Sequence, residues 1–171
     1  MVAMILVDTI DSPIGALTMA ERAGRICLLQ FGLDGPAVDA MFERWYPGEP
    51  RARQALPGIG GVMKRYFEGQ IGALDTIPVE LNGTPFQKEV WQALRRIPAG
   101  TTISYAELAK RIGNAAAVRA VGSANGANPV AVIVPCHRVI GSNGTLTGYG
   151  GGLDRKQWLL AHEGISTPTL F

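Results

Sequence analysis

The sequence predicts an α+β protein in which a small N-terminal domain of strands and helices precedes a mostly helical C-terminal domain. Strand-like runs fill much of the first 31 residues, and apolar residues recur at helical spacing from Phe86 onward. A stretch with the composition of a connector separates the two patterns. We therefore expect an N-terminal domain over 1–75, a connector over 76–83, a C-terminal domain over 84–165 and a tail over 166–171.

The N-terminal elements follow from apolar runs and the turn residues between them. Strands are expected over residues 4–10, 16–19 and 25–31. Two short helices are expected after them, over 37–45 and 59–67. Cys27 lies inside the third apolar run, so it is interpreted as a core residue, because free cysteine packs like a small hydrophobe.

The C-terminal domain shows clearer helix start and stop signals. Thr84 and Gln87 form the pattern of a capping box, with proline at the first helical position between them. Ser104 and Glu107 repeat the capping pattern, and the helix that they open stops at Gly113. A further helix is expected over 115–125. A short helix, a glycine turn and a second helix are typical of a helix-turn-helix.

The expected helix over 115–125 is built almost entirely from small residues, with one long cation, Arg119, in its middle. Small residues permit tight packing against a neighbouring helix. They also make a slim helix that can enter a DNA groove, where arginines and wedging side chains are used by minor-groove proteins. The spacing alone leaves both interpretations open.

Charge is distributed unevenly along the 171-residue chain, whose formal net charge is +2. Residues 1–83 carry 7 basic and 10 acidic side chains, a net charge of −3. Residues 84–171 carry 9 basic and 4 acidic side chains, a net charge of +5. A basic half favours a polyanionic partner.

Several classes of protein are disfavoured by composition. No apolar run approaches the roughly 20 residues of a membrane span, and residues 1–10 are too short and too lightly charged for a secretory signal. Two cysteines do not make a disulfide framework, so we expect a cytoplasmic protein, or a nuclear one in a eukaryote. Adjacent Cys136 and His137 lack zinc-site spacing, and neither a metal nor a cofactor is expected.

The segment 135–139, Pro-Cys-His-Arg-Val, places one of two cysteines before one of two histidines. The apolar run 130–134 before it predicts a short buried strand, and Asn143-Gly144 after it predicts a tight turn. A thiol at a strand end beside an imidazole is typical of a reactive cysteine. The alternative is a buried structural cysteine.

The C-terminal end adds a glycine-rich loop over 148–152, which lets the backbone approach a ligand closely, and a helix over 154–163. Glu163 falls in the last turn of that helix, where the helix dipole disfavours an anion. It is either a solvated surface carboxylate or one that has a partner, for which His137 is a candidate.

Residues 84–164 resemble the O6-alkylguanine-DNA alkyltransferases, also called methylated-DNA–protein-cysteine methyltransferases. The resemblance is dense and collinear, and Cys136 distinguishes the chain from alkyltransferase-like proteins that lack an acceptor cysteine. It rests on Thr84-Pro85-Phe86-Gln87, Val90-Trp91, Ile97-Pro98-Ala99-Gly100-Thr101, Ser104-Tyr105, Arg119-Ala120-Val121-Gly122, Asn128-Pro129, Pro135-Cys136-His137-Arg138-Val139, Gly151-Gly152-Leu153 and Trp158-Leu159-Leu160-Ala161-His162-Glu163-Gly164.

The resemblance implies direct transfer of an alkyl group from O6-alkylguanine in double-stranded DNA to Cys136, in a single turnover without cofactor. A water, His137 and Glu163 would complete the proton relay, because adjacent side chains of an extended chain point to opposite faces. The resemblance also implies a ribonuclease H-like N-terminal domain and a monomer. Activity on O4-alkylthymine and the range of alkyl groups are left open.

The resemblance assigns further residues to DNA and base recognition. Arg119 would fill the stack that the flipped nucleotide vacates, and its helix would lie in the minor groove with Ala120, Gly122 and Ser123. Tyr105 would push on the phosphate next to the flipped nucleotide, bond the base and help guanine leave as a neutral group. Asn128 would tie the helix-turn-helix to the active-site strand. Backbone groups of Cys136, Val139 and Gly150 would read guanine, although some relatives carry serine at the last of these positions. Arg138 would have a structural role through a salt bridge.

Two functions from other classes compete with this interpretation. A DNA-binding regulator would use the helix-turn-helix and the basic half, but it leaves Cys136-His137 and the glycine loop unexplained. A cysteine hydrolase would use the same pair, but it requires an oxyanion hole and turnover. Reaction that stops after one equivalent separates the transferase from the hydrolase.

Overall fold

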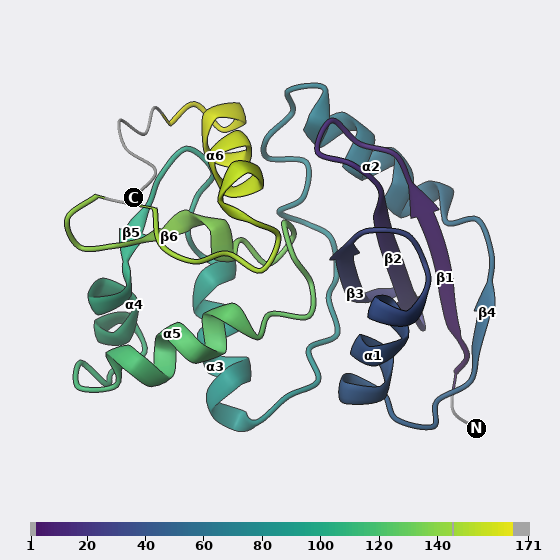
Figure 1. Cartoon of the computed structure of the whole chain (residues 1–171), viewed down its shortest axis with the longest axis horizontal. Coiled ribbons are helices and arrows are strands. Elements are labelled where there is room, and N and C mark those ends of the chain that lie inside the picture. Colours follow the sequence, from purple (N-terminus) through teal and green to yellow (C-terminus); the bar gives the residue numbers. More distant parts are fainter. Residues whose placement is uncertain (1–2, 145, 166–171) are drawn as a thin grey trace. The chain divides into compact units, whose positions relative to one another are not determined.

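The computed structural model describes residues 3–144 and 146–165, and the chain divides into two compact units (Figure 1). Unit 1 comprises Met1–Asn82 and Pro129–Ile133, and unit 2 comprises Gly83–Asn128 and Val134–Phe171. The expected mixed α+β composition is confirmed. The expected tail, 166–171, lies outside the described residues, and the expected domain boundaries stay a prediction.

Unit 1 contains a four-stranded sheet with strand order β3-β2-β1-β4. β1 is antiparallel to β2, β2 is antiparallel to β3, and β1 is parallel to β4. The strands are β1 (Ile5–Ile10), β2 (Leu17–Arg22), β3 (Arg25–Phe31) and β4 (Arg51–Arg53). The three predicted strands are present. The fourth, β4, is not predicted, because it is a three-residue edge strand with two arginines and has no apolar run.

The two helices of unit 1 each begin with a proline, a residue that suits the first helical position because its missing N–H would have no partner there. They are α1 (Pro36–Trp45) and α2 (Pro57–Phe67). Their apolar faces bury Phe42, Trp45, Met63 and Tyr66. Cys27 is fully buried in β3, as predicted.

The predicted strand over 130–134 is wrong. Only Val130 pairs with a strand, through an isolated parallel bridge to Leu29, and the following residues turn. Val132 has a positive φ of 69°, which is incompatible with an extended strand. All five side chains are buried, so the apolar run predicts burial correctly but does not predict the backbone conformation.

Unit 2 is mostly helical. Its helices are α3 (Pro85–Arg95), α4 (Tyr105–Arg111), α5 (Val118–Gly126) and α6 (Leu153–His162), with a 3₁₀ turn, η1, at Cys136–Arg138. A two-stranded parallel sheet pairs β5 (Ile103–Ser104) with β6 (Val139–Ile140). This short sheet fixes the segment that follows η1 next to the start of α4.

The two predicted capping boxes differ in the structure. In α3 both bonds form, because Thr84 Oγ1 accepts from the Gln87 amide and Gln87 Oε1 accepts from the Thr84 amide. In α4 the Ser104 hydroxyl accepts from the Glu107 amide at 3.0 Å. In a capping box the Glu107 carboxylate would accept from the Ser104 amide, but here it accepts from Arg111 Nε, one turn later.

The helix that was expected over 115–125 begins later, at Val118, because a turn from Asn114 to Ala117 precedes it. Its buried face packs within unit 2, where the indole of Trp91 donates to the Ala124 carbonyl at 2.8 Å. A Cβ added at Gly122 would lie 3.8 Å from the Tyr105 ring. The small residues therefore do allow close packing between α4 and α5.

Candidate active site

Cys136 is the first residue of η1 and is only 6% exposed. The turn closes through a 3.0 Å bond from the Arg138 amide to the Pro135 carbonyl. The expectation that Cys136 and His137 lie on extended chain is therefore wrong, and alternation of faces does not separate their side chains. Instead, the side chains of all three residues of the 3₁₀ turn, Cys136, His137 and Arg138, are buried.

His137 contacts Glu163, the C-cap residue of α6. Its Nε2 lies 3.0 Å from Glu163 Oε2, and both side chains are fully buried. The sequence suggests His137 as a partner for Glu163, because an anion is disfavoured at a helix C-terminus. The structure places the two side chains in contact. Nδ1 of His137 is buried and has no hydrogen-bond partner among the described residues.

Arg138 holds the same carboxylate from a second side. Its Nε donates to Glu163 Oε1 at 2.8 Å and its Nη2 donates to Oε2 at 3.0 Å, a bidentate arrangement. Its Nη1 donates to the Ile97 carbonyl at 2.6 Å. The salt bridge expected of Arg138 is present, and it fixes the end of α6 against the acceptor turn.

The charge states in this cluster follow from burial and hydrogen bonding. Burial alone would raise the pKa of Glu163, but bonds from His137 and Arg138 outweigh it and lower that pKa. Burial lowers the pKa of His137, although Glu163 opposes this. An ionised Glu163 requires the Nε2–H of a neutral His137 to donate, so the lone pair is on Nδ1. That nitrogen can accept a proton.

The Cys136 thiol is not spontaneously ionised. Burial raises its pKa, while a hydrogen bond from Asn128, the charge of Lys156 and the Tyr149 hydroxyl act in the opposite direction. Since the thiolate is the nucleophile, a base must remove the proton during reaction. His137 Nδ1, on the next residue, is buried without a hydrogen-bond partner among the described residues and has the lone pair that such a base requires.

Asn128 lies just beyond the end of α5 and connects it to the acceptor segment. Its Nδ2 donates to the Val134 carbonyl at 2.7 Å. The neighbouring Asn125 donates to the Cys136 carbonyl at 3.5 Å. The structure therefore places Asn128 where a link between the second helix and the acceptor was expected.

Tyr105 opens α4, and its hydroxyl accepts from the Thr147 hydroxyl at 3.2 Å. Val139 is buried at the start of β6, whereas Gly150 is exposed in the loop before α6. A Cβ added at Gly150 would meet no atom within 4 Å, so packing does not demand glycine there. Within the described residues, no side-chain hydrogen bond joins Tyr105, Val139 or Gly150 to Cys136.

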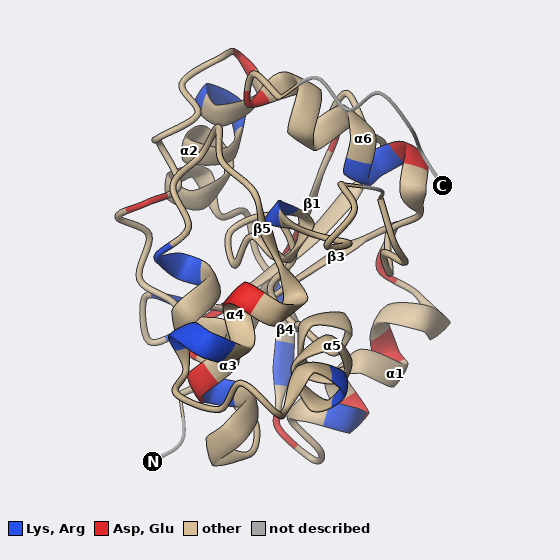
Figure 2. Ribbon diagram, turned by 90° about the vertical axis from the view of Figure 1, so that its left-hand side faces the viewer, with Lys and Arg blue, Asp and Glu red and all other residues tan. Residues whose placement is uncertain are grey.

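The outer face of α5 presents the residues expected to contact DNA. Arg119, Ala120 and Ser123 are exposed and Gly122 is half-buried. Val121, Ala124 and Asn125 are buried on the opposite face. The packing interpretation therefore holds for the buried face, and the groove interpretation stays a prediction for the exposed face. Basic residues are found along α3, α4 and α6 as well as α5 (Figure 2).

Comparison with known proteins identifies the family. The DNA-binding domain of 6-O-methylguanine DNA methyltransferase matches residues 85–165. A methylated-DNA–protein-cysteine methyltransferase of Mycolicibacterium paratuberculosis is 48% identical, over 98% of this chain and 99% of its own. That of Salmonella typhimurium is 43% identical, over 94% and 96%. The chain belongs to this methyltransferase family.

A solved structure of a family member with bound DNA is also similar. The Mycobacterium tuberculosis OGT in complex with DNA superimposes with a TM-score of 0.78 and 43% identity, covering 92% of each chain. The family resemblance and the enzyme class predicted from the sequence are confirmed, and so are methyltransferase activity, DNA repair and DNA binding as general assignments.

Sequence reasoning missed one buried residue of the methyltransferase site, Lys156 in α6. It is fully buried, and its Nζ donates to the carbonyls of Val139 and Thr147. A signal was present, because Lys156 lies three and four residues before Leu159 and Leu160, on the apolar stripe of the helix. A lysine at such a position needs polar partners inside the protein.

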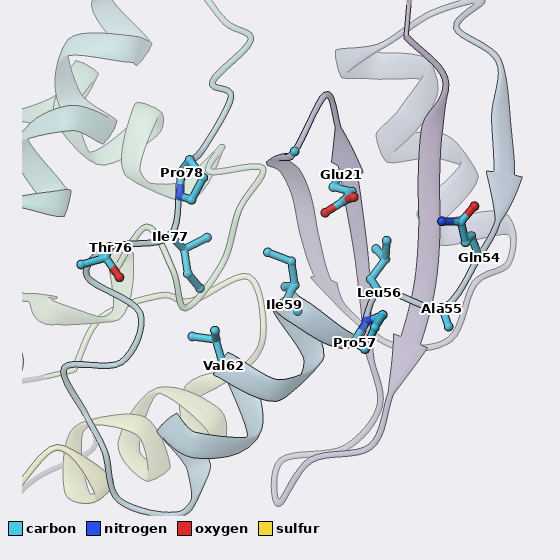
Figure 3. A pocket seen from close by; sticks show the side chains of 12 residues that line it. Glu21, Gln54, Ala55, Leu56, Pro57, Ile59, Val62, Thr76, Ile77 and Pro78 are labelled. Carbon is cyan, nitrogen blue, oxygen red and sulfur yellow. The ribbon is translucent and has the colours of Figure 1, made fainter.

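Unit 1 contains a surface pocket of about 490 Å³ between the β2–β3 turn, the start of α2 and residues 76–78 (Figure 3). Its lining is mostly apolar, with Glu21 and Gln54 among the polar residues. None of the predicted site residues line it. Within the described part of the chain, no group of three or more acidic, histidine or cysteine residues could hold a metal ion.

The described helices are all too short or too polar to cross a membrane.

Proposed function

We propose that this chain flips O6-alkylguanine out of duplex DNA and transfers the alkyl group irreversibly to Cys136. One observation carries the proposal: the acceptor thiol and His137 occupy one buried turn, and Glu163 holds the imidazole through Nε2 at 3.0 Å. That bond leaves Nδ1 of His137 as the proton acceptor, with a water as the relay to the thiol.

The chemistry is an in-line displacement at a saturated carbon. The Cys136 thiol gives its proton to His137, a new bond forms between sulfur and the alkyl carbon, and the bond between that carbon and guanine O6 breaks. The electron pair of the broken bond leaves with guanine. The Tyr105 hydroxyl gives its proton to this guanine anion, which leaves as a neutral base, and solvent returns a proton to the tyrosine and takes the one held by His137. The thioether is stable, so each molecule reacts once.

We assign recognition of the base to the backbone of Cys136, Val139 and Gly150. The exposed face of α5 is the face that enters the minor groove. Arg119 supports this assignment because it is exposed and forms no ion pair with another described residue, and Ala120, Gly122 and Ser123 lie on the same helix. A buried target atom has to leave the base stack before it can reach the thiol. Arg119 would occupy the vacated place.

Replacing Arg119 by alanine should slow repair of duplex DNA by about tenfold or more, while reaction with free O6-benzylguanine stays near that of the unchanged protein. The free base needs no flipping, so the two substrates separate flipping from chemistry. Single-turnover rates measure both reactions. Arg25→Ala is the matched control, because Arg25 is an exposed arginine of unit 1. Equal loss on both substrates would remove the flipping role.

Raising the salt concentration should weaken binding to an unmodified duplex, with log K falling linearly against log salt at a slope of about −0.9 per phosphate neutralised. The net charge of +5 on residues 84–171 is the source of this dependence. Fluorescence anisotropy with a labelled duplex measures it. A flat response would contradict a DNA interface on the basic half.

Stoichiometry tests the proposed function against its rivals. With a radiolabelled O6-methylguanine duplex in excess, label on the protein should rise to one equivalent and stop. Continued release of label into solution would indicate a hydrolase, and tight binding without transfer would indicate a regulator. The same titration with a duplex that contains O4-alkylthymine tests whether that base is also a substrate.

We further propose a monomeric protein of the cytoplasm, or of the nucleus in a eukaryote. The strand order β3-β2-β1-β4, with β4 parallel to β1, supports the ribonuclease H-like arrangement that the resemblance implies for unit 1. Sedimentation at several concentrations tests the monomer, and fractionation of the source cells tests the location.

A further inference from the structure

Asn125 in α5 is a buried amide that the proposed transfer chemistry does not use. It is 4% exposed, and its Nδ2 makes one long hydrogen bond, at 3.5 Å, to the Cys136 carbonyl. Its Oδ1 is also buried and has no hydrogen-bond partner among the described residues. Native proteins pair nearly all of their buried polar atoms, so an unpaired acceptor at this place calls for a partner that the folded chain does not supply.

The Cys136 carbonyl determines which way the Asn125 amide is turned. A carbonyl oxygen can only accept a hydrogen bond, so the amide nitrogen has to face it and the amide oxygen has to face away. The side of the amide that is left without a bond is therefore an acceptor. Its partner must be an N–H or an O–H group.

Along α5, Asn125 lies between two groups that are expected to hold the flipped base. Gly122 is one turn earlier, on an adjoining side of the helix, and a Cβ built on it would be 3.8 Å from the Tyr105 ring. Asn125 itself reaches the Cys136 carbonyl. A base that Tyr105 bonds, and whose alkyl carbon meets the Cys136 sulfur, would therefore lie beside Asn125.

A flipped O6-alkylguanine offers a single kind of N–H donor. Alkylation at O6 leaves N1 without a proton, N9 is bonded to the sugar, and N3 and N7 are acceptors. The 2-amino group is then the one group of the base that can donate, and it has two hydrogens. A site that recognises this base by hydrogen bonding must therefore present acceptors to the 2-amino group.

The acceptors beside the acceptor turn differ in how many bonds they already hold. The Cys136 carbonyl accepts from the Val139 amide and from Asn125. The Val139 carbonyl accepts from Lys156 at 2.7 Å. Asn125 Oδ1 accepts no hydrogen bond from any described residue, so both of its lone pairs are available to a ligand.

We propose that Asn125 is a specificity-determining residue, whose Oδ1 accepts a hydrogen bond from the 2-amino group of the flipped O6-alkylguanine. This inference rests on the proposed function and names the feature of the base that the side chain recognises. A base that lacks the 2-amino group leaves Asn125 Oδ1 unpaired. A site that is built around a hydrogen bond discriminates against a ligand that cannot form it.

A cycle of protein variants and two substrates isolates this bond. One duplex contains O6-methylguanine, and the other contains O6-methylhypoxanthine, which differs only in lacking the 2-amino group. Asn125→Leu removes the acceptor at a similar side-chain volume. Gln92→Leu is the matched control, because Gln92 is an exposed amide of α3. Single-turnover reactions give the limiting rate and the half-saturating concentration for each pair, and circular dichroism checks that each variant is folded.

The unchanged protein should react with O6-methylguanine about tenfold faster or more than with O6-methylhypoxanthine at subsaturating concentration. Asn125→Leu should shrink this preference by about fivefold or more, because only the base with the amino group loses a bond. Asn125→Ala should also shrink it, so that a leucine variant that fails to fold does not end the test. Gln92→Leu should keep the preference of the unchanged protein.

An undiminished preference in a folded Asn125→Leu or Asn125→Ala protein overturns the inference. This holds even if both rates fall, since equal loss on the two duplexes is the result of a purely structural amide. Equal reaction of the unchanged protein with both duplexes overturns it as well. These results leave transfer to Cys136 standing, whereas failure of the unchanged protein to react with either duplex defeats the proposed function and the inference with it.

Discussion

Replacing Cys136 by alanine should abolish alkyl transfer and leave binding to duplex DNA intact. The thiol is the only group of the acceptor turn, Cys136–Arg138, with the nucleophilicity that displacement at a saturated carbon requires. Cys136 lies in η1 and is only 6% exposed, so its side chain contributes little to the protein surface. Transfer is measured with radiolabelled duplex, and binding by anisotropy.

Cys27→Ala is the matched control for this prediction. Cys27 is the other cysteine of the chain, fully buried in β3, and burial raises its pKa to about 12. Its removal should leave transfer at one equivalent. Transfer that persists in Cys136→Ala, or is lost in a folded Cys27→Ala protein, would contradict the assignment of the acceptor.

Replacing Glu163 by glutamine should reduce both stability and rate. Arg138 would lose its buried bidentate counter-ion, and leaving one partner of a buried pair uncompensated typically costs about 3–5 kcal/mol. A glutamine amide can also donate to His137 Nε2, which moves the imidazole proton to Nδ1 and blocks it as an acceptor. We expect the limiting rate to fall by about 10². Urea unfolding and single-turnover kinetics measure the two effects.

The contribution of Glu163 to stability should depend on pH. Its pKa in the folded protein lies below its ordinary value of 4.5, so its stabilisation is fully present above the unfolded pKa. It is lost as the pH falls from there through the folded pKa. The difference in unfolding free energy between the unchanged protein and Glu163→Gln should therefore shrink on acidification.

Glu107→Gln is the control for this series, because Glu107 pairs with Arg111 on the surface of α4. Exposed pairs contribute about 0–1 kcal/mol, so its effect should be small at every pH. A Glu163→Gln protein as stable and as fast as the unchanged one would contradict the role of the His137–Arg138–Glu163 cluster.

Local signals in the sequence were sufficient for much of the helical unit. Thr84, Pro85 and Gln87 specify the start of α3 through bonds within four residues, and the structure contains both bonds. The contact between Glu163 and His137 can be predicted for a different reason. An anion at a helix C-terminus is disfavoured by the helix dipole unless a hydrogen-bond donor or a cation pairs with it. Such features depend on few atoms and can be inferred from residue types alone.

Features that depend on contacts with residues distant in the sequence cannot be predicted from local patterns. The run 130–134 has the composition of a strand, but its backbone follows the bridge between Val130 and Leu29 and then turns at Val132. Hydrophobic composition predicts burial and not φ and ψ. The apolar stripe of α6 indicates that Lys156 is buried, but its two carbonyl partners come from segments whose conformation the sequence does not specify.

The central claim is that Cys136 is an alkyl acceptor that reacts once, and intact-mass spectrometry with peptide mapping tests it most directly. The protein is mixed with excess duplex containing O6-methylguanine and then digested. The account predicts a mass increase of one CH₂ unit, located on the Cys136 peptide and ending at one equivalent. An unchanged mass with DNA binding retained, or a methyl group on a different peptide, would contradict it.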